Sequence, residues 1–325
     1  MKALLLTVAL LLGCITASSQ DKDTGIITVS TNDLSMVFSI SADKKVVYNY
    51  FGDKFQHVSP FLNKKYKEQP DNGIGYAPVI YPAYGGRFFL NPALKLTHND
   101  GVQTTELIYA DHQVKNIDNN RTETVIRLKD PLYPVFVNLN FTAYRKENVI
   151  CQSVSISHQE KNKLAVENIA SAYLPLHADS YYLTHFHGAW ASEMQLVEEK
   201  LTPGVKRVES KKGVRTTQSE NSSFLLSLNG PANEDRGEVY AGSLAWSGNY
   251  LSSFEIDECG LLHVMSGMND FASTYNLEPG KTLQTPEMEW YGHTVLPVRD
   301  RYRETCTTGR ATMRWLMVTG NCLLS

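Results

Sequence analysis

The stretch from Glu238 to Glu287 decides the fold. With the preceding glycine its first part reads GEVYAGSLAWSGNY (237–250), and its last part reads LHVMSGMNDFASTYNLEPGKTLQTPE (262–287). Residues 238–250 alternate small or apolar side chains with polar ones and end at the turn signal Gly248-Asn249. A second turn follows at Glu278-Pro279-Gly280-Lys281, and an extended run restarts at Leu283. The pattern predicts strands joined by tight turns.

Period-two alternation continues through most of residues 25–287, between clusters of Gly, Pro, Asn and Asp. The clearest predicted strands cover residues 25–31, 34–40, 124–128, 135–144, 148–157 and 223–228. One helix-like candidate, residues 66–69, is too short to count. Many strands without a helical pattern predict an all-β fold of stacked antiparallel sheets.

Composition limits the function classes. A chain of 325 residues with 42% hydrophobic residues can bury one large all-β domain or two smaller ones. The formal net charge of −3 argues against a nucleic-acid partner, because phosphate binding needs a basic face. The longest basic feature, Lys206-Arg207 to Arg215, is interrupted by Glu209 and is typical of a solvated strand face.

The N-terminus has the features of a targeting segment. Lys2 precedes the apolar run 3–12, which is too short to span a bilayer, and Ala17-Ser18-Ser19 offers small residues for cleavage. Residues 1–19 are therefore interpreted as a signal peptide of a secreted or periplasmic protein. An alternative is a lipoprotein box ending at Cys14, which would then carry a lipid anchor, although Leu12 is bulky for that position.

Few side chains in the sequence suggest a catalytic or metal-binding site. Cys151 and Cys259 lie in strand-like runs and are expected to be two buried free thiols. His185 and His187 would share one face of a strand, a geometry that can bind zinc, but no third ligand such as His177 or Glu193 is placed beside them. An edge-strand histidine pair is the favoured interpretation, and the sequence predicts no metal and no cofactor.

Two further groups of residues are candidate sites. Adjacent residues Asp257 and Glu258 would point to opposite faces of a strand, so they are expected to be surface carboxylates and not an acid–base pair. Five aromatic residues could stack on a sugar, but core or domain-contact roles are favoured. They are Tyr181, Tyr182, Trp190, Trp246 and Tyr250. No catalytic, substrate-binding or metal-binding residue is therefore assigned.

Several short motifs follow one another along the chain. They are YPAYG (81–85), YLTHFHGAWASE (182–193), VESKKGVRTT (208–217), SLAWSGNY (243–250), GMNDF (267–271), LEPG (277–280) and TPE (285–287). In this order they resemble the motifs of family 36 glycoside hydrolases, the α-galactosidases. Each is weak alone, but their order and spacing make chance improbable. The resemblance implies that residues 20–288 form the family's N-terminal β-super-sandwich, which has a galactose-mutarotase-like fold.

The resemblance also implies where the chemistry lies. In the family a following (β/α)8 barrel supplies two Asp carboxylates for retaining hydrolysis of terminal α-galactosyl residues. That barrel is expected to be absent from this chain and to be the natural intramolecular partner of the sandwich. Many members also carry Asp and Arg in a D-F-R-x-P-A run that reaches toward the active site. The corresponding FFLNPA (88–93) lacks both, so no substrate contact is transferred to Phe88 or Leu90.

The character of the sequence changes after Met288. Residues 289–325 show no clean strand period and hold five arginines, two cysteines and two tryptophans. A basic linker is one interpretation, although linkers are seldom rich in Cys and Trp. The favoured interpretation is a frameshifted, non-native tail, because a shifted reading permits SRNL followed by HNWARDY, which looks like the family's linker into the barrel. In the shifted reading, the codons of Met317-Val318 can encode only glycine, and those of Asn321-Cys322 can encode only leucine.

Three functions remain open at this point. The leading hypothesis is the N-terminal domain of a secreted α-galactosidase, inactive without its barrel. The second is a free-standing carbohydrate-binding β-sandwich module. The third is a structural β-sandwich surface protein.

Overall fold

The computed structural model describes residues 25–54, 78–85, 88–214, 219–233 and 237–295. All helix or strand structure in these ranges is β-strand, and every pair of named strands is antiparallel, as the alternation predicts. None of these ranges contains a helix, so none offers a helical span long and apolar enough for a bilayer. The predicted signal peptide, Cys14 and the short candidate 66–69 lie outside the described residues.

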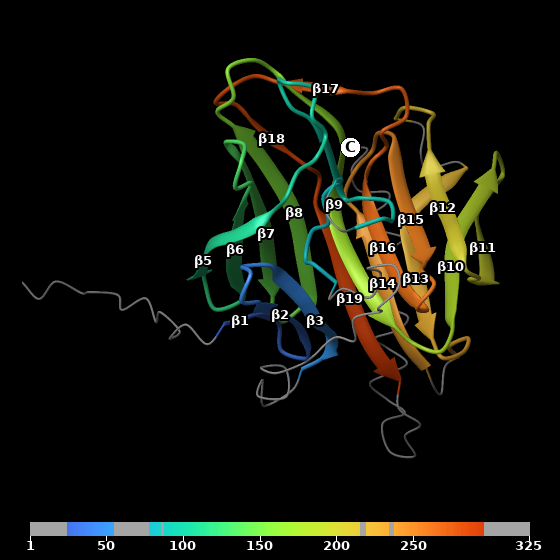
Figure 1. The fold of residues 1–325 in the computed structure, drawn as a ribbon. Helices are drawn as coiled ribbons and strands as arrows, with labels where there is room; N and C mark the ends of the chain where they lie inside the picture. The colour runs from blue at the N-terminus through green and yellow to red at the C-terminus, as the bar shows by residue number, and fades with distance from the viewer. Residues whose placement is uncertain (1–24, 55–77, 86–87, 215–218, 234–236, 296–325) are drawn as a thin grey trace, which may run out of the picture.

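The largest sheet has ten strands and forms the rear layer of the molecule (Figure 1). Its order is β11-β10-β13-β14-β19-β8-β7-β6-β5, with β18 also paired to β8. Its strands are β5 (Ile108–Asn116), β6 (Arg121–Lys129), β7 (Val135–Tyr144), β8 (Val149–His158), β10 (Tyr181–Ala189), β11 (Ser192–Lys200), β13 (Glu220–Leu228), β14 (Gly237–Leu244), β18 (Thr282–Gln284) and β19 (Met288–Val295).

Two smaller sheets form the front layer. One has six strands in the order β12-β15-β16-β9-β17, with β4 also paired to β9, and the other has the order β1-β2-β3. Their strands are β1 (Ile26–Ser30), β2 (Leu34–Ile40), β3 (Val46–Asp53), β4 (Leu94–Thr97), β9 (Leu164–His177), β12 (Gly204–Ser210), β15 (Tyr250–Ile256), β16 (Leu261–Met268) and β17 (Tyr275–Leu277).

Aromatic side chains join the two layers. Phe224 of β13 meets Phe254 of β15 edge to face, with 4.8 Å between ring centroids. At the other end, Phe38 of β2 packs on Phe141 of β7 at 5.4 Å. Aromatic pairs of this kind stabilise the fold by more than the apolar area they bury. Because side chains alternate between the two faces of a strand, every second side chain lies between the layers. The core is therefore the interior of a β-sandwich.

An ion pair joins the edge strands of the two layers on one side of the sandwich. Edge strands β11 and β12 are joined by an ion pair between Glu199 and Lys206, and His185 Nε2 lies 3.3 Å from the same Glu199 oxygen. Burial, followed by the charge of Lys206, lowers the pKa of His185. Charged side chains on edge strands also discourage pairing with another chain.

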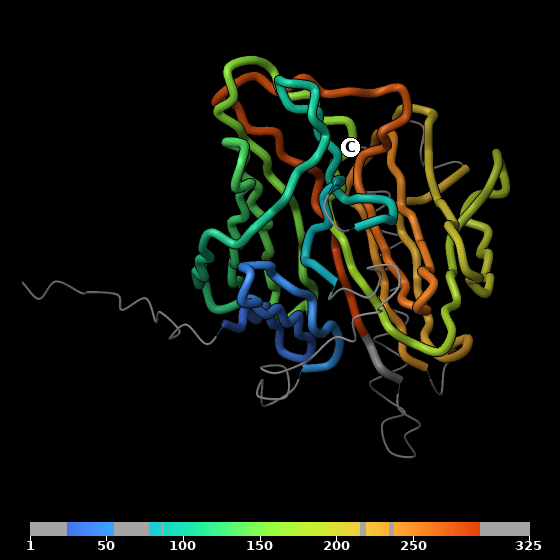
Figure 2. The backbone as a smooth tube through the Cα atoms, in the orientation of Figure 1, coloured from blue at the N-terminus to red at the C-terminus, as the bar shows by residue number. Residues whose placement is uncertain are grey.

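Residues 78–85 and 88–93, which precede β4 in the chain, lie against the front sheet (Figure 2). Tyr81, from YPAYG, is buried here, and its hydroxyl donates to the carbonyl of Ala170 at 2.6 Å. Phe88 packs edge to face on Tyr173 of β9. This segment therefore covers part of the outer face of the front sheet.

The domain does not end at Met288, contrary to the boundary expected from sequence. Strand β19 crosses that point and lies in the middle of the ten-stranded sheet, between β14 and β8. Trp290 is 0% exposed. A Cβ at Gly292 would lie 2.7 Å from Leu34 Cδ1, so any larger residue there requires the Leu34 side chain to shift. Residues up to Val295 therefore belong to the sandwich, and the rest of the predicted non-native tail, residues 296–325, lies outside the described residues.

Cys259 also differs from the sequence expectation. Cys151 is buried in β8, but Cys259 is exposed in the turn between β15 and β16. The turn residues Asp257 to Gly260 break the strand that the sequence pattern suggested, which brings the thiol into solvent. Both cysteines are free.

Candidate functional site

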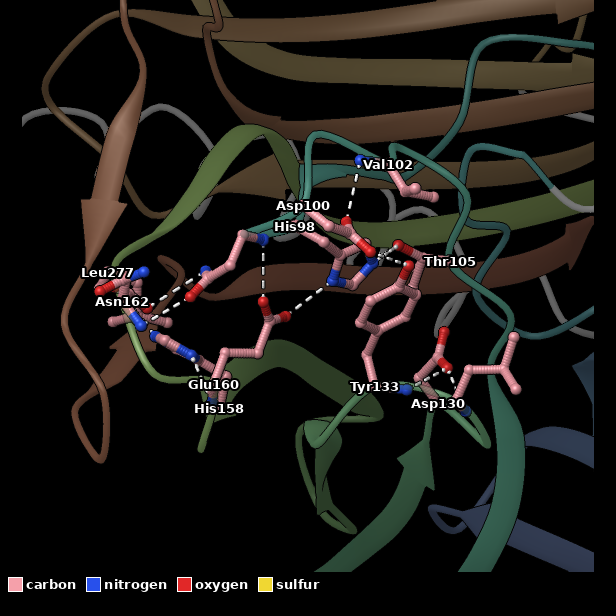
Figure 3. Close-up of polar contacts among 12 residues, drawn as sticks. His98, Asp100, Val102, Thr105, Asp130, Tyr133, His158, Glu160, Asn162 and Leu277 are labelled. Atoms are coloured by element: carbon pink, nitrogen blue, oxygen red, sulfur yellow. Dashed lines mark hydrogen bonds and ion pairs between the residues drawn. The ribbon is translucent and has the colours of Figure 1, made fainter.

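A buried polar network joins two loops at one end of the sandwich (Figure 3). His98 Nδ1 lies 2.7 Å from Glu160 Oε1, and His98 Nε2 lies 3.1 Å from Thr105 Oγ1. The second oxygen of Glu160 accepts the backbone N–H of Asn99 at 2.9 Å. The side chains of His98 and Glu160 are 0% and 6% exposed.

Tyr133 covers this network. Its ring stacks on His98 with 3.7 Å between centroids, and its hydroxyl donates to Asp100 at 2.8 Å. Backbone and side-chain hydrogen bonds, from Val102 and then from Tyr133, hold the pKa of Asp100 below its usual range. Every polar atom of His98 is used and its side chain is shielded from solvent. The network therefore fastens loops together and does not offer a reactive group to a substrate.

A second polar chain runs through the front sheet. Asp257 Oδ2 lies 3.0 Å from His263 Nε2, and His263 Nδ1 lies 2.8 Å from the hydroxyl of Tyr173. Burial alone would raise the pKa of Asp257, but hydrogen bonds from His263 and from the N–H of Leu261 outweigh it and lower the pKa. The Asp257 side chain is only 8% exposed, so the expectation of a surface carboxylate is wrong for Asp257, whereas Glu258 is exposed.

The two histidines weighed as metal ligands take separate partners. His185 lies beside Glu199 of β11, whereas His187 Nδ1 lies 2.8 Å from Glu220 of β13. A register irregularity between the two histidines interrupts their pairing with β13. The described part of the chain contains no group of three or more His, Cys, Asp or Glu residues that could hold a metal ion.

The five aromatic residues weighed as a sugar platform divide into two groups. Tyr181 and Tyr250 are buried in the core, and Tyr182 is half-buried. Trp190 is 83% exposed after β10, and Trp246 is 41% exposed in the turn after β14. They do not form one platform, because the strands place them in different environments.

The FFLNPA segment is held against the front sheet. Phe88 is half-buried against Tyr173 and His263, whereas Phe89 is exposed. The N–H and Nδ2 of Asn91 both donate to Glu255 Oε2, at 3.1 and 2.7 Å. These contacts anchor the segment to β15 and leave an open hollow beside it.

That hollow, named here the front groove, lies between residues 91–95 and strands β9, β16, β15 and β12. It has a volume of about 180 Å³, and its lining includes Asn168, Arg207, Gly267 and Asp270. A second hollow of about 440 Å³ adjoins it and shares Lys95, Asn168 and Asp270. Sequence reasoning missed this concavity, because it forms where β9, β12 and the β15–β16 hairpin, which are separate in the chain, come together with residues 91–95.

The wall of the second hollow gives a pH prediction. Glu167 lies 2.6 Å from Lys95 Nζ and accepts hydrogen bonds from Thr97 and Gln103. These contacts, led by the one from Lys95, lower the pKa of Glu167 from 4.5. The folded state therefore binds this proton less tightly than the unfolded state, so its stabilisation is complete above pH 4.5 and is lost as pH falls through the lowered pKa.

Glu167→Gln is expected to reduce the free energy of unfolding by about 1 kcal/mol at pH 7. The deficit relative to the wild type should persist down to pH 5 and shrink below pH 4.5. Urea unfolding of both proteins at several pH values measures it. A deficit that grows toward acid would show that the ionised carboxylate does not stabilise the fold.

Comparisons with known proteins agree with this architecture. The family model described as the glycosyl hydrolase family 36 N-terminal domain matches residues 44–278. The α-galactosidase AgaA of Geobacillus stearothermophilus is 32% identical over 278 residues, which are 78% of this chain and 38% of that protein. α-Galactosidase 2 of Pediococcus pentosaceus is 26% identical over 289 residues, covering 82% of this chain and 40% of that protein.

Solved structures give the same fold. The crystal structure of AgaA in complex with raffinose has a TM-score of 0.77 at 26% identity and covers 83% of this chain and 41% of that one. AgaB of the same organism has a TM-score of 0.74 at 27% identity, covering 84% and 40%. The chain thus spans about two fifths of the relatives it matches, and the expected super-sandwich is confirmed. The chain belongs to the family of glycosyl hydrolase family 36 N-terminal domains.

Proposed function

We propose that this chain is the N-terminal part of an exported α-galactosidase, which hydrolyses terminal α-D-galactosyl residues of oligosaccharides and polysaccharides. The family match over residues 44–278, with an α-galactosidase 32% identical along 78% of the chain, carries this proposal. The raffinose in the AgaA crystal structure supports an α-galactoside as the sugar class. The sandwich is a supporting domain in this proposal.

The hydrolysis itself belongs to the part of the relatives that this chain does not match. A retaining glycosidase needs two carboxyl groups about 5–5.5 Å apart, one as nucleophile and one as acid and then base. In a (β/α)8 barrel such residues sit at the ends of different strands, whose spacing sets that separation. In this proposal the catalytic barrel is therefore the intramolecular partner of the sandwich, and the 325-residue chain alone is inactive.

One end of the sandwich offers a surface for that partner. Val214 is 77% exposed, and Trp246 lies near it because the Trp246 Nε1–H and the N–H of Gly213 both bond to Asn249. Trp190, which is 83% exposed, lies at the same end of the ten-stranded sheet, since the ends of β10 and β14 both pair with the start of β13. These side chains follow β10, β12 and β14. Exposed large apolar residues gathered in this way are typical of a domain or protein contact.

The activity experiment compares two proteins. The first is the 325-residue chain, and the second is translated from the same DNA with the frame shifted after codon 295 so that reading continues. We expect the first to release no galactose from raffinose and the second to turn over at a rate on the order of 1–10³ s⁻¹. Turnover by the repurified 325-residue chain, or no activity from a well-folded longer protein, would contradict the proposal.

We also propose export through residues 1–19, with secretion or periplasmic release favoured over a lipid anchor at Cys14. The N-terminal apolar run supports it. Mass spectrometry of the mature N-terminus separates the two routes, because signal cleavage leaves Gln20 first whereas a lipoprotein begins at an acylated Cys14. A protein that retains Met1 would contradict export.

A further inference from the structure

Part of the lining of the front groove has short side chains or none. The pairing of β16 with β9 shifts register between Ser266 and Gly267. At Gly267 the strands approach so closely that a Cβ would lie 2.8 Å from Ala170 Cα. β-Bulges with glycine allow such close approach and are frequent beside binding sites. Ala170 and Ser253 are the short neighbours that leave the depression open.

The wall of the groove is held in place before any ligand arrives. Asn168 Nδ2 donates to the carbonyl of Pro92 at 2.7 Å, and Asn91 is doubly bonded to Glu255. The Nδ2 group of Asn168 thus holds the wall, while its amide oxygen has no hydrogen-bond partner among the described residues. A preformed wall reduces the ordering cost of binding.

Arg207 and Asp270 place charges of opposite sign on the rim that are not paired with one another. Among the described residues, the exposed Arg207 guanidinium makes no ion pair and the exposed Asp270 carboxylate accepts no side-chain hydrogen bond. Lys95 is paired with Glu167. A phosphate would meet Asp270 and Glu167, and a cation would meet Arg207 and Lys95, so neither charge class is favoured.

A neutral ligand with many hydroxyl groups satisfies this surface. Each hydroxyl both donates and accepts, so it can accept from Arg207 and donate to Asp270 or to the oxygen of Asn168. Leu251 and Met265 offer apolar contact for the C–H face of a ring. We propose that the front groove is a saccharide-binding site and that the adjoining hollow extends it to a second sugar ring.

The experiment uses the 325-residue protein and follows its backbone amide NMR signals during titration with raffinose up to 50 mM. Raffinose is chosen because of the proposed function. The groove's affinity for sugars does not depend on that function, so maltotriose and cellobiose are titrated in parallel. We expect millimolar binding of at least one sugar, with shifts confined to residues 91–95, 168, 207, 251–253 and 265–270. Binding of another sugar but not raffinose would support the groove and count against the α-galactoside assignment.

Two variants locate the binding. Arg207→Ala removes an exposed donor, and Ser253→Leu fills the floor; each is expected to weaken binding at least fivefold. Lys163→Ala, which removes an exposed ion pair with Glu278, is the matched control and should bind like the wild type. No sugar binding at 50 mM, unchanged affinity in both groove variants, or preferential binding of inorganic phosphate would overturn the proposal. Circular dichroism confirms that each variant is folded.

Discussion

Trp290→Ala is expected to lower the free energy of unfolding by about 3–5 kcal/mol. Trp290 lies on β19 in the centre of the ten-stranded sheet and is fully buried. Its ring meets Phe224 at 6.1 Å and Phe51 at 6.3 Å between centroids, and its Nε1–H donates to Gln152 at 3.3 Å. The alanine variant leaves a cavity between the two layers and a buried amide oxygen without its donor.

Trp190→Ala is the matched control, because Trp190 is 83% exposed and its loss should change the free energy of unfolding by about 0.5 kcal/mol or less. Urea unfolding measures both variants against the wild type. Equal and small effects would show that β19 is not part of the packed sandwich and that the native sequence ends earlier.

Glu160→Ala is expected to lower the free energy of unfolding by about 1–4 kcal/mol, since it leaves one buried and one part-buried group unpartnered, and a fully buried one costs about 1–3 kcal/mol. The groups are His98 Nδ1 and the N–H of Asn99, each of which meets its own oxygen of Glu160. Glu160→Gln keeps one acceptor oxygen and should lower the free energy of unfolding by roughly half as much. The loss should appear as a lower unfolding midpoint in urea with an unchanged slope.

Glu278→Ala is the control for that experiment. Glu278 forms an exposed ion pair with Lys163 at 2.8 Å, so its removal should cost about 0–1 kcal/mol. If Glu160→Ala were as mild as Glu278→Ala, the buried network would not fasten the loops and the inference from burial would be wrong.

Much of the fold follows from local pattern. Residues 135–144 alternate so regularly that β7 matches its predicted bounds, and Gly280 adopts a φ of 73° in the turn that Glu278-Pro279-Gly280-Lys281 predicts. The sequence places the end of the domain too early, at Met288, because residues 288–295 mix bulky polar and apolar residues. That is a poor alternation for a central strand. Only tertiary pairing shows that Glu289 and Tyr291 share the outer face with their strand neighbours while Trp290 faces the core.

The polar sites could not be predicted in the same way. His98 and Glu160 are separated by 62 residues, and no local signal links them. The sequence suggests a surface carboxylate at Asp257 because its partner, His263, lies six residues away. Only the turn between β15 and β16 brings the two side chains together. The front groove depends on a register shift at Gly267, which sequence periodicity does not specify.

Resequencing the coding DNA from codon 285 across the stop codon tests the central claim most directly, namely that this sandwich is the N-terminal domain of an α-galactosidase. The account predicts that codons through 295 stand as read, and that a one-base correction after them opens a frame continuing through HNWARDY into a (β/α)8 barrel. A confirmed stop after Ser325, with no barrel-coding frame downstream, would contradict it and leave sugar binding as the function of the sandwich.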